Sequence, residues 1–171
     1  FGSVVSWSQG DDGAYTVNMN MDLSLADGSY HDVTYSIIEG DATFTFMQSR
    51  AGVKTGDVLA DYQGVTTFTL SDSSIEGTYS LDIVIPADEV DAATDDPLRD
   101  LYVVNTLAAK KIAGTRIKIA ATDAQGNTSS HTYEIQPVEN VAERYRELLE
   151  QKESDEGQQL GETLFTMREV A

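Results

Sequence analysis

A chain of 171 residues is long enough for one well-buried domain, or for one domain with an appendage. Its 29 acidic and 11 basic side chains give a formal charge of −18, so nucleic acid and anionic membrane surfaces are disfavoured as partners. The absence of cysteine excludes a disulfide framework, a thiolate zinc site and a cysteine nucleophile. No apolar run reaches the roughly 18 residues of a transmembrane helix, and the sequence predicts no membrane span.

The first half of the chain is patterned as β-strands. Between residues 15 and 25 apolar side chains alternate with polar ones, which is the period of a half-buried strand. Runs rich in β-branched and aromatic residues predict further strands at 3–7, 30–38, 43–47 and 65–70. Residues 79–85 alternate again and stop at Pro86, because proline cannot donate a hydrogen bond to a β-ladder.

The pattern changes between residues 87 and 113, which we interpret as an insertion at one end of the domain. Asp96 followed by Pro97 is typical of a helix N-terminus, and Gly114 is placed to end that helix. The face of this helix would carry Leu98, Leu101 and Tyr102, with Lys110 and Lys111 in the last turn. Residues 102–104 favour a strand instead, which is the alternative for this part of the insertion.

Residues 115–136 form the clearest hairpin in the sequence, and we expect it to be the last strand pair of the domain. Apolar residues alternate over 116–122 and again over 128–135. The connection runs from Asp123 to Asn127 and includes Gly126, which can supply the positive φ angle of a tight turn. The side chain of Asp123 is expected to accept hydrogen bonds from the turn amides, with calcium binding as the lesser alternative.

After Pro137 the composition becomes rich in glutamate, which favours helices. Residues 138–152 predict an amphipathic helix, and Leu160, Leu164, Phe165 and Met167 suggest a second, shorter one. The apolar stripe of the first helix either packs on the domain or docks a partner, including a second copy of the chain. We take that stripe as a candidate interface formed by Val138, Val141, Tyr145, Leu148 and Leu149.

Two segments carry a resemblance to a known class of domain. Residues 114–128, GTRIKIAATDAQGNT, resemble the closing strands of bacterial immunoglobulin-like and fibronectin-type-III-like surface domains. Residues 77–86, GTYSLDIVIP, resemble the strand that precedes them. The resemblance implies an all-β, immunoglobulin-like antiparallel β-sandwich over residues 1–136, with the insertion at 87–113 and a C-terminal helical appendage over 137–171.

Function is implied only broadly by this resemblance, because the sandwich hosts many roles. It implies an exported, non-enzymatic module of a bacterial surface protein of the lipoprotein or adhesin type, located outside the cell or at its surface. Such a module serves as a spacer, in adhesion or in ligand presentation, with a protein or a glycan as its partner. The alternatives are a carbohydrate-binding accessory domain of a glycan-uptake system, and a structural subunit of a virus or an extracellular filament.

An acidic stretch lies inside the insertion and is the candidate calcium site. Calcium takes six to eight oxygen ligands, which clustered aspartates on one loop can supply. The candidate ligands are Asp88, Asp91, Asp95 and Asp96. Their spacing does not fit an EF-hand loop, and the alternative is a solvated loop with carboxylates at a helix N-terminus. No other cofactor is expected.

Aromatic and ionisable side chains give weaker signals. Trp7, Tyr30 and Tyr62 could stack on sugar rings if they shared a surface, although a single tryptophan in a sandwich is more often a core residue. His31 and His131 lie a hundred residues apart and are interpreted as ordinary strand residues. No Gly-x-Ser-x-Gly motif is present, and with 29 acids any pair of carboxylates is uninformative, so the sequence predicts no enzyme.

Overall fold

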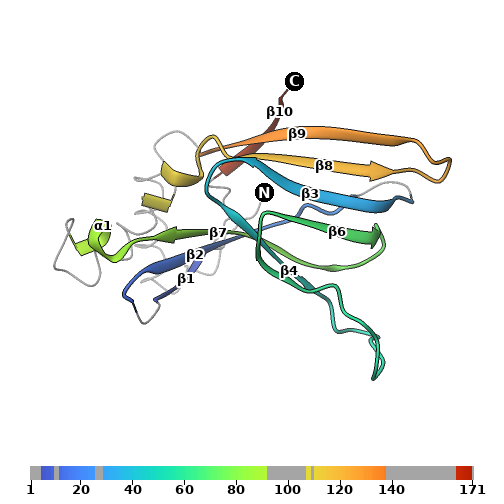
Figure 1. Ribbon diagram of the computed structural model, residues 1–171, viewed down its shortest axis with the longest axis horizontal. Coiled ribbons are helices and arrows are strands. Elements are labelled where there is room, and N and C mark those ends of the chain that lie inside the picture. Colours follow the sequence, from blue (N-terminus) through green and yellow to red (C-terminus); the bar gives the residue numbers. More distant parts are fainter. Residues whose placement is uncertain are drawn as a thin grey trace, which may run out of the picture.

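The computed structural model describes residues 5–9, 12–25, 29–91, 107–108, 110–137 and 165–170. These residues form two antiparallel sheets of five strands each, stacked as a β-sandwich (Figure 1). The prediction of an antiparallel all-β sandwich is therefore confirmed at this level. No helix within the described ranges is both long and apolar enough to cross a membrane.

The first sheet is built from strands within residues 5–85, whereas the second combines strands from both halves of the chain. The first sheet has the order β1 (Val5–Gln9), β2 (Tyr15–Met21), β7 (Gly77–Ile85), β4 (Thr43–Gln48) and β5 (Tyr62–Val65). The second has the order β10 (Phe165–Val170), β9 (Thr128–Pro137), β8 (Arg116–Thr122), β3 (His31–Glu39) and β6 (Thr67–Asp72). Because sequence neighbours such as β2 and β3 lie in different sheets, the chain crosses between the layers repeatedly.

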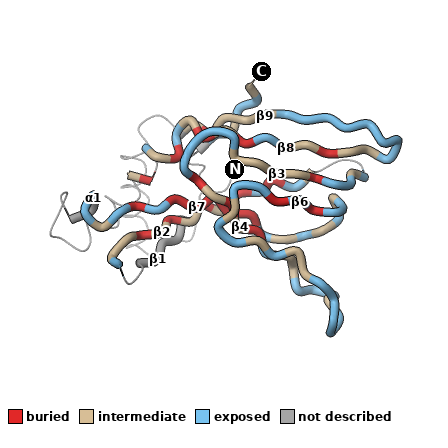
Figure 2. Tube along the Cα trace, viewed as in Figure 1, coloured by how far each residue is buried: buried red, intermediate tan, exposed pale blue. Residues whose placement is uncertain are grey.

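The core lies between the sheets, and the alternation of the sequence places residues there. Along β2 every second side chain is buried, and Figure 2 shows the same alternation as red segments on the inner strands. Val17, Leu81 and Ile117 come from three strands and are each at most 4% exposed. A period-two pattern in sequence therefore becomes one buried face per sheet, which is the main source of stability in such a fold.

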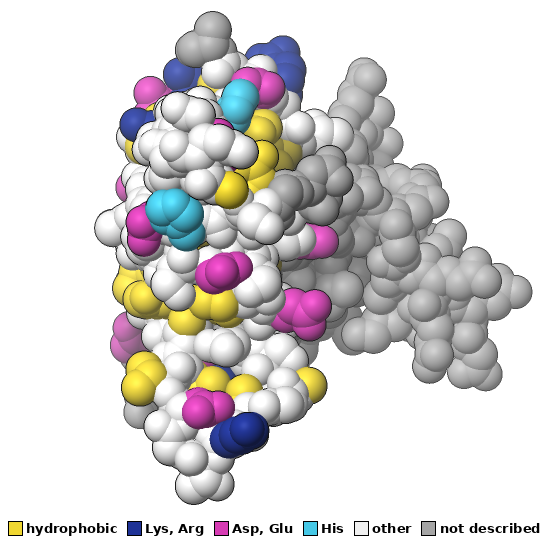
Figure 3. Space-filling view, turned by 90° about the vertical axis from the view of Figure 1, so that its right-hand side faces the viewer, with side chains coloured by type: hydrophobic (Ala, Val, Ile, Leu, Met, Phe, Trp, Pro, Cys, Tyr) yellow, Lys and Arg dark blue, Asp and Glu magenta, His cyan; other side chains and the backbone are white. Residues whose placement is uncertain are grey.

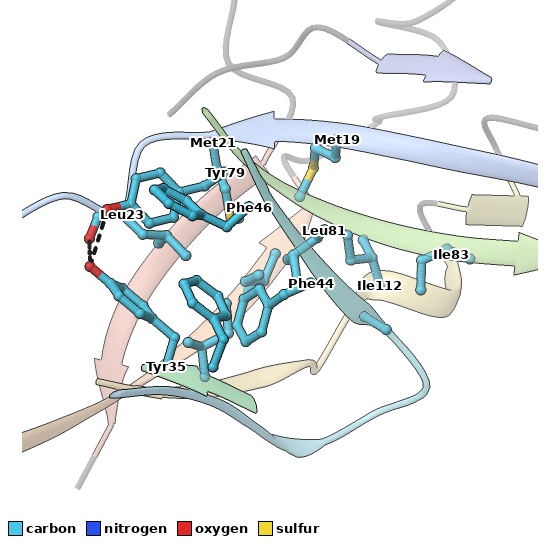
Figure 4. Packing of buried hydrophobic residues seen from close by; sticks show 14 of the residues in the cluster. Met19, Met21, Leu23, Tyr35, Phe44, Phe46, Tyr79, Leu81, Ile83 and Ile112 are labelled. Atoms are coloured by element: carbon cyan, nitrogen blue, oxygen red, sulfur yellow. Dashed lines mark hydrogen bonds between the residues drawn. The ribbon is translucent and has the colours of Figure 1, made fainter. Parts of the chain in front are cut away.

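Aromatic rings fill one part of this core (Figure 4). Phe46 of β4 has its ring centroid 4.8 Å from that of Tyr79 on β7 and 5.6 Å from that of Phe68 on β6. Tyr35 of β3 stacks on Phe68 at 4.9 Å. Its hydroxyl donates to the backbone carbonyl of Leu23 at 2.8 Å and lies 3.4 Å from the Tyr79 hydroxyl. These contacts join both sheets and satisfy the buried phenol groups.

The strands β5 and β6 close one side of the sandwich. Only Thr66 separates them, and its carbonyl accepts a hydrogen bond from the Ile37 amide at 2.8 Å. The Tyr62 hydroxyl donates to the Thr69 carbonyl at 3.1 Å, which ties the edge of the first sheet to the edge of the second. The opposite side is bordered by β1 and β10, the strands nearest the two ends of the chain.

The hairpin of residues 115–136 is confirmed, with β8 and β9 paired from Arg116–Glu134 to Thr122–Thr128. It is not the last strand pair, because β10 adds to the free edge of β9. The short helix suggested by Phe165 and Met167 is therefore wrong over Phe165–Val170. Phe165 and Met167 are two positions apart, so in a strand they lie on the same face of the sheet. Met167 packs against the core on this face.

The described residues at the two ends of the insertion are helical. Helix α1 (Ala87–Asp91) starts directly after Pro86, earlier than the start predicted at Asp96, because acidic residues in its first turn favour a helix N-terminus. Residues 107–108 and 110–112 are helical, and Gly114 ends that segment with a φ of +81°, as predicted. The predicted N-cap at Asp96, with Leu98, Leu101 and Tyr102, lies outside the described residues.

Gly77, at the start of β7, is packed too closely to carry a side chain. A Cβ atom there would lie 2.5 Å from the Met47 carbonyl oxygen and 2.5 Å from Cζ of Phe46. We expect Gly77→Ala to lower the free energy of unfolding by about 1–3 kcal/mol, as overpacking does in well-filled cores. Urea denaturation measures the change. The matched control is Thr78→Ala at the next residue of the same strand, because Thr78 is exposed.

Candidate functional site

A groove opens on the inner face of the second sheet, beside the β8–β9 hairpin. It has a volume of about 220 Å³ and is called here the hairpin groove. Its walls are Leu25, Tyr30, Ile119, Ala121, Ser129, His131 and Tyr133. Figure 3 views the end of the molecule that carries the hairpin, and hydrophobic side chains gather there next to a histidine and an acidic side chain. Several of these residues belong to the inner face of the second sheet.

The groove exists because the inner face of β9 is progressively uncovered toward the turn. His131 pairs with Ile119, and Ser129 pairs with Ala121, so these four residues share the core face of the sheet. Along this face of β9, Ile135 is fully buried, Tyr133 is half-buried, and His131 and Ser129 are exposed. The outer end of the hairpin therefore presents core-facing positions to solvent.

A carboxylate from the last strand holds His131 in place. Nδ1 of His131 lies 2.7 Å from Oε1 of Glu169 on β10, and both side chains are more than half exposed. The two residues come from neighbouring strands, because Glu169 pairs with Tyr133, two positions from His131. With Nδ1 directed to the carboxylate, Nε2 is the ring nitrogen that is left for a ligand. The ring centroid of Tyr133 is 6.5 Å from that of His131.

The groove combines an apolar floor with a polar rim. Ile119 and Ala121 are at most 9% exposed, and Leu25 packs against the same core. Tyr133 and Tyr30 add aromatic surface with a hydroxyl group each. Such a mixture takes a small apolar or ring-shaped group and orients it by a few hydrogen bonds.

Asp123 organises the hairpin turn, as predicted. Its Oδ1 accepts hydrogen bonds from the backbone amides of Gln125 and Asn127, each at 2.9 Å. These bonds, led by the one from Asn127, hold the pKa of the Asp123 carboxyl below its usual range. Gly126 has the positive φ, +86°, expected for this connection. The role of Asp123 is therefore to fix the turn at the outer end of the groove.

Asp123→Ala should destabilise the protein at neutral pH, because the turn amides lose their acceptor. The folded-state pKa is lowered, so the stabilisation is fully present above the pKa of the unfolded chain and is lost as pH falls through the folded value. The difference between wild type and variant should therefore shrink below about pH 4. Denaturant unfolding across that range measures it. A difference that stays constant down to about pH 2 would contradict the role assigned to the carboxylate.

Two of the four candidate calcium ligands lie within the described residues. Asp88 and Asp91 lie on α1, whereas Asp95 and Asp96 lie outside the described residues. Among the residues that the structure describes, no group of three or more His, Cys, Asp or Glu side chains is arranged to hold a metal ion. Helix α1 is instead connected to the second helical segment by Lys111, whose Nζ lies 3.4 Å from Oε1 of Glu89.

The three candidate sugar-stacking residues are not brought together. Trp7 lies on β1 and Tyr62 on β5, which are the opposite edge strands of the first sheet. The ring of Tyr62 packs 5.3 Å from that of Phe68, at the closed side. Tyr30 is part of the hairpin groove, so it is the one member of the set that lies at the candidate site.

The two histidines are also apart. Strand β8 lies between β3, which carries His31, and β9, which carries His131. His31 contacts the adjacent Asp32 at 3.0 Å, at an irregularity in β3. Both are strand residues, as predicted. The candidate interface lies outside the described residues: Val138, Val141, Tyr145, Leu148 and Leu149.

Of the residues at the site, only Tyr30 was named from the sequence as a ligand-binding candidate; no site role was assigned to Leu25, Ile119, Ala121, Ser129, Tyr133 or Glu169. The alternation of His131, Tyr133 and Ile135 was visible and indicated one shared face. Glu169 could not be found in the same way, because the tail was interpreted as helical and its strand pairing depends on a contact far along the sequence. No protein-family model, curated protein or solved structure matches the chain.

Proposed function

We propose that this chain is a non-enzymatic binding module of an exported bacterial surface protein, with an immunoglobulin-like sandwich as its scaffold. The hairpin groove is the observation that carries the proposal. It exposes the core-facing residues Ser129 and His131 of β9 beside a largely buried apolar floor of Ile119 and Ala121, and it adds hydroxyl, imidazole and carboxylate groups. An apolar floor with a polar rim is the usual composition of a binding site.

The strand order supports the immunoglobulin-like part of this proposal. An immunoglobulin sandwich places strands A, B, E and D in one sheet and C, F and G in the other. Here β1, β2, β7 and β4 are neighbours in one sheet, and β3, β8 and β9 are neighbours in the other. The core differs from that of antibody domains, because Tyr35 occupies β3 where they have tryptophan, and the chain has no cysteine.

The surroundings of His131 favour binding over catalysis. Nucleophilic catalysis needs a base within hydrogen-bond reach of a hydroxyl or thiol. Within the part of the chain that the structure describes, the hydrogen-bond partner of His131 is Glu169, and no described serine, threonine or tyrosine hydroxyl donates to it. A histidine held by a carboxylate in an open groove serves instead as an oriented donor or acceptor for a ligand.

The proposal is tested with a simple apolar probe. We expect N-acetylvalinamide to bind the wild type saturably in ligand-observed NMR, because its isopropyl group fits the apolar floor and its amides reach the rim. Ser129→Trp should abolish the signal by filling the groove. Val84→Trp is the matched control, since Val84 is 59% exposed on the other sheet. Equal binding by both variants, or none by the wild type, would contradict the groove as a site.

A glycan is the second candidate ligand, and the tyrosine rings favour it specifically. Tyr30 and Tyr133 offer aromatic surface, while Ser129, His131 and Glu169 offer hydrogen-bonding groups in the range that sugar hydroxyls use. This would make the chain a carbohydrate-binding accessory domain. A glycan array with the wild type and Tyr133→Ala tests it: binding that the variant loses supports the glycan, and an empty array dismisses it.

Location outside the cell is part of the proposal and rests on the resemblance of residues 77–86 and 114–128 to exported surface domains. The absence of cysteine is compatible with export, and a formal charge of −18 favours solubility. Fractionation of the native cells with an antibody against the domain tests the location. Recovery of the protein in the cytosolic fraction alone would contradict it.

A further inference from the structure

The segment between β4 and β5 projects away from the sandwich (Figure 1). It comprises residues 49–61 and is called here the arm. Most of it is exposed, as the pale tube in Figure 2 shows. A loop of this length is compatible with a surface connection of no special role, so the argument depends on how the arm is held and on what it exposes.

Ordered contacts brace the base of the arm. Arg50 makes two hydrogen bonds with the Asp61 carboxylate, at 2.6 and 3.1 Å, which join the two ends of the arm. Gln48 adds a second bridge, because its side-chain Oε1 accepts from the Ala60 backbone amide at 2.8 Å and its backbone amide donates to Oδ1 of Asp61 at 3.0 Å. The arm is therefore a fixed projection of the sheet and not an open loop.

The outer part of the arm turns tightly and then exposes an aliphatic side chain. The Asp57 amide donates to the Lys54 carbonyl at 3.1 Å, and Gly56 takes a φ of +94° within this turn. Val58 follows directly and is 96% exposed, far more than any other exposed large hydrophobic residue of the described chain. Leu59, next to it, is half-buried. A braced projection thus carries an apolar group into solvent.

The arm carries no net charge, although the chain as a whole is strongly acidic. It contains two cations, Arg50 and Lys54, and two anions, Asp57 and Asp61, so its formal charge is zero in a chain of −18. Two copies of the chain repel each other over most of their surfaces. The neutral arm can approach a second acidic copy with little repulsion, which favours a second copy as the partner.

The hairpin groove has the size and polarity to receive the arm. Cavities of about 150 Å³ lined by aliphatic and aromatic side chains hold a benzene-sized group. The groove, at about 220 Å³, therefore accommodates Val58 on its floor of Ile119 and Ala121. Lys54 and Asp57 both lie close to Val58 in sequence, so this part of the arm brings no net charge to the Glu169 carboxylate at the rim. The arm and the hairpin lie well apart in Figure 1, so a chain cannot fill its own groove.

We propose that the arm of one copy inserts Val58 into the hairpin groove of a second copy. The two surfaces differ, so the contact is heterologous and links copies head to tail into a ring or a filament. This inference rests on the proposed function, because the same groove is the receptor. The small contact area implies weak association, and screening of the net charge by salt should strengthen it.

Sedimentation velocity over a concentration series up to about 1 mM tests the proposal at low and high salt. We expect the wild type to associate, and more strongly at high salt. Val58→Asp should weaken association by about 10-fold or more, because the buried valine is lost. Val84→Asp makes the same change at a 59% exposed valine elsewhere and should have no effect. Association that survives Val58→Asp would overturn the proposal.

Mixing two variants separates this contact from a symmetric one. Val58→Asp lacks the inserting side chain but keeps an open groove. Ser129→Trp has a filled groove but keeps the inserting side chain. Each alone should be monomeric, and an equimolar mixture should give a one-to-one dimer and nothing larger. A mixture that stays monomeric overturns the proposal. If the wild type is monomeric yet still binds N-acetylvalinamide, the arm inference alone fails; if it neither associates nor binds the probe, the proposed function fails with it.

Discussion

Phe46→Ala should lower the free energy of unfolding by about 3–5 kcal/mol, the usual cost of removing a fully buried aromatic ring. Phe46 is completely buried, and its ring contacts Phe68 on the second sheet and Tyr79 on the first. It also packs on Gly77, where a Cβ would lie 2.5 Å from the ring. The substitution therefore leaves a cavity beside Phe68, Tyr79 and Gly77.

Met47→Ala is the matched control for this prediction. Met47 is the next residue of β4, and it is 44% exposed on the outer face. We expect its loss to change stability by less than about 0.5 kcal/mol, as exposed substitutions usually do. Guanidinium unfolding followed by circular dichroism measures both variants. Similar effects at positions 46 and 47 would mean that β4 does not alternate as described.

Tyr35→Phe should lower the free energy of unfolding by about 1–3 kcal/mol, because a buried hydrogen-bond acceptor is left without its donor. The Tyr35 hydroxyl donates to the Leu23 carbonyl at 2.8 Å and lies 3.4 Å from the Tyr79 hydroxyl. Removing one oxygen leaves the shape of the ring unchanged. The measured loss therefore reports the hydrogen bonds and not the packing.

The buried hydroxyl groups of Tyr35 and Tyr79 predict that the protein loses stability at alkaline pH. Burial, with the contact to Tyr79, raises the pKa of Tyr35 far above its usual value, and burial also raises the pKa of Tyr79. For groups with raised folded-state pKa values, the stabilisation is complete below the pKa of the unfolded chain and is lost as pH rises above it. The wild type should therefore lose stability above about pH 10.

Tyr133→Phe is the control for both effects of the tyrosine pair. Tyr133 is half-buried at the rim of the groove, so removal of its hydroxyl should change stability by less than about 0.5 kcal/mol. Denaturant unfolding from about pH 8 to pH 11 compares the three proteins. At alkaline pH, Tyr35→Phe should lose less of its free energy of unfolding than the wild type does. Tyr133→Phe should lose as much as the wild type. An alkaline loss of equal size in Tyr35→Phe would contradict the assignment.

Local patterns in the sequence were sufficient for much of the fold. The alternation from Tyr15 to Met21 and from Tyr79 to Ile85 correctly indicated two strands, which turn out to be neighbours in the first sheet. The Asp123 turn was predictable because an aspartate followed by Gly126 and Asn127 has a specific hydrogen-bonding geometry. These features depend on residues close together in sequence, where steric and hydrogen-bonding rules act directly.

Features that depend on long-range pairing were not predictable in the same way. Strand β10 was interpreted as helix because Leu164, Phe165 and Met167 lie near helical spacing, and only its pairing with β9 settles the matter. The approach of Glu169 to His131 follows from that pairing and from nothing local. The groove itself depends on where one sheet stops covering the other, which is a property of the whole sandwich.

The central claim is that the hairpin groove is where this chain binds other molecules. The most direct test is an amide chemical-shift map of dilute wild-type protein during titration with N-acetylvalinamide. The account predicts that the largest shifts fall on the groove residues of β8 and β9, at Ile119, Ala121, Ser129, His131 and Tyr133. Shifts centred instead on the outer face of the first sheet, around Asn18, Ser80 and Val84, would contradict it.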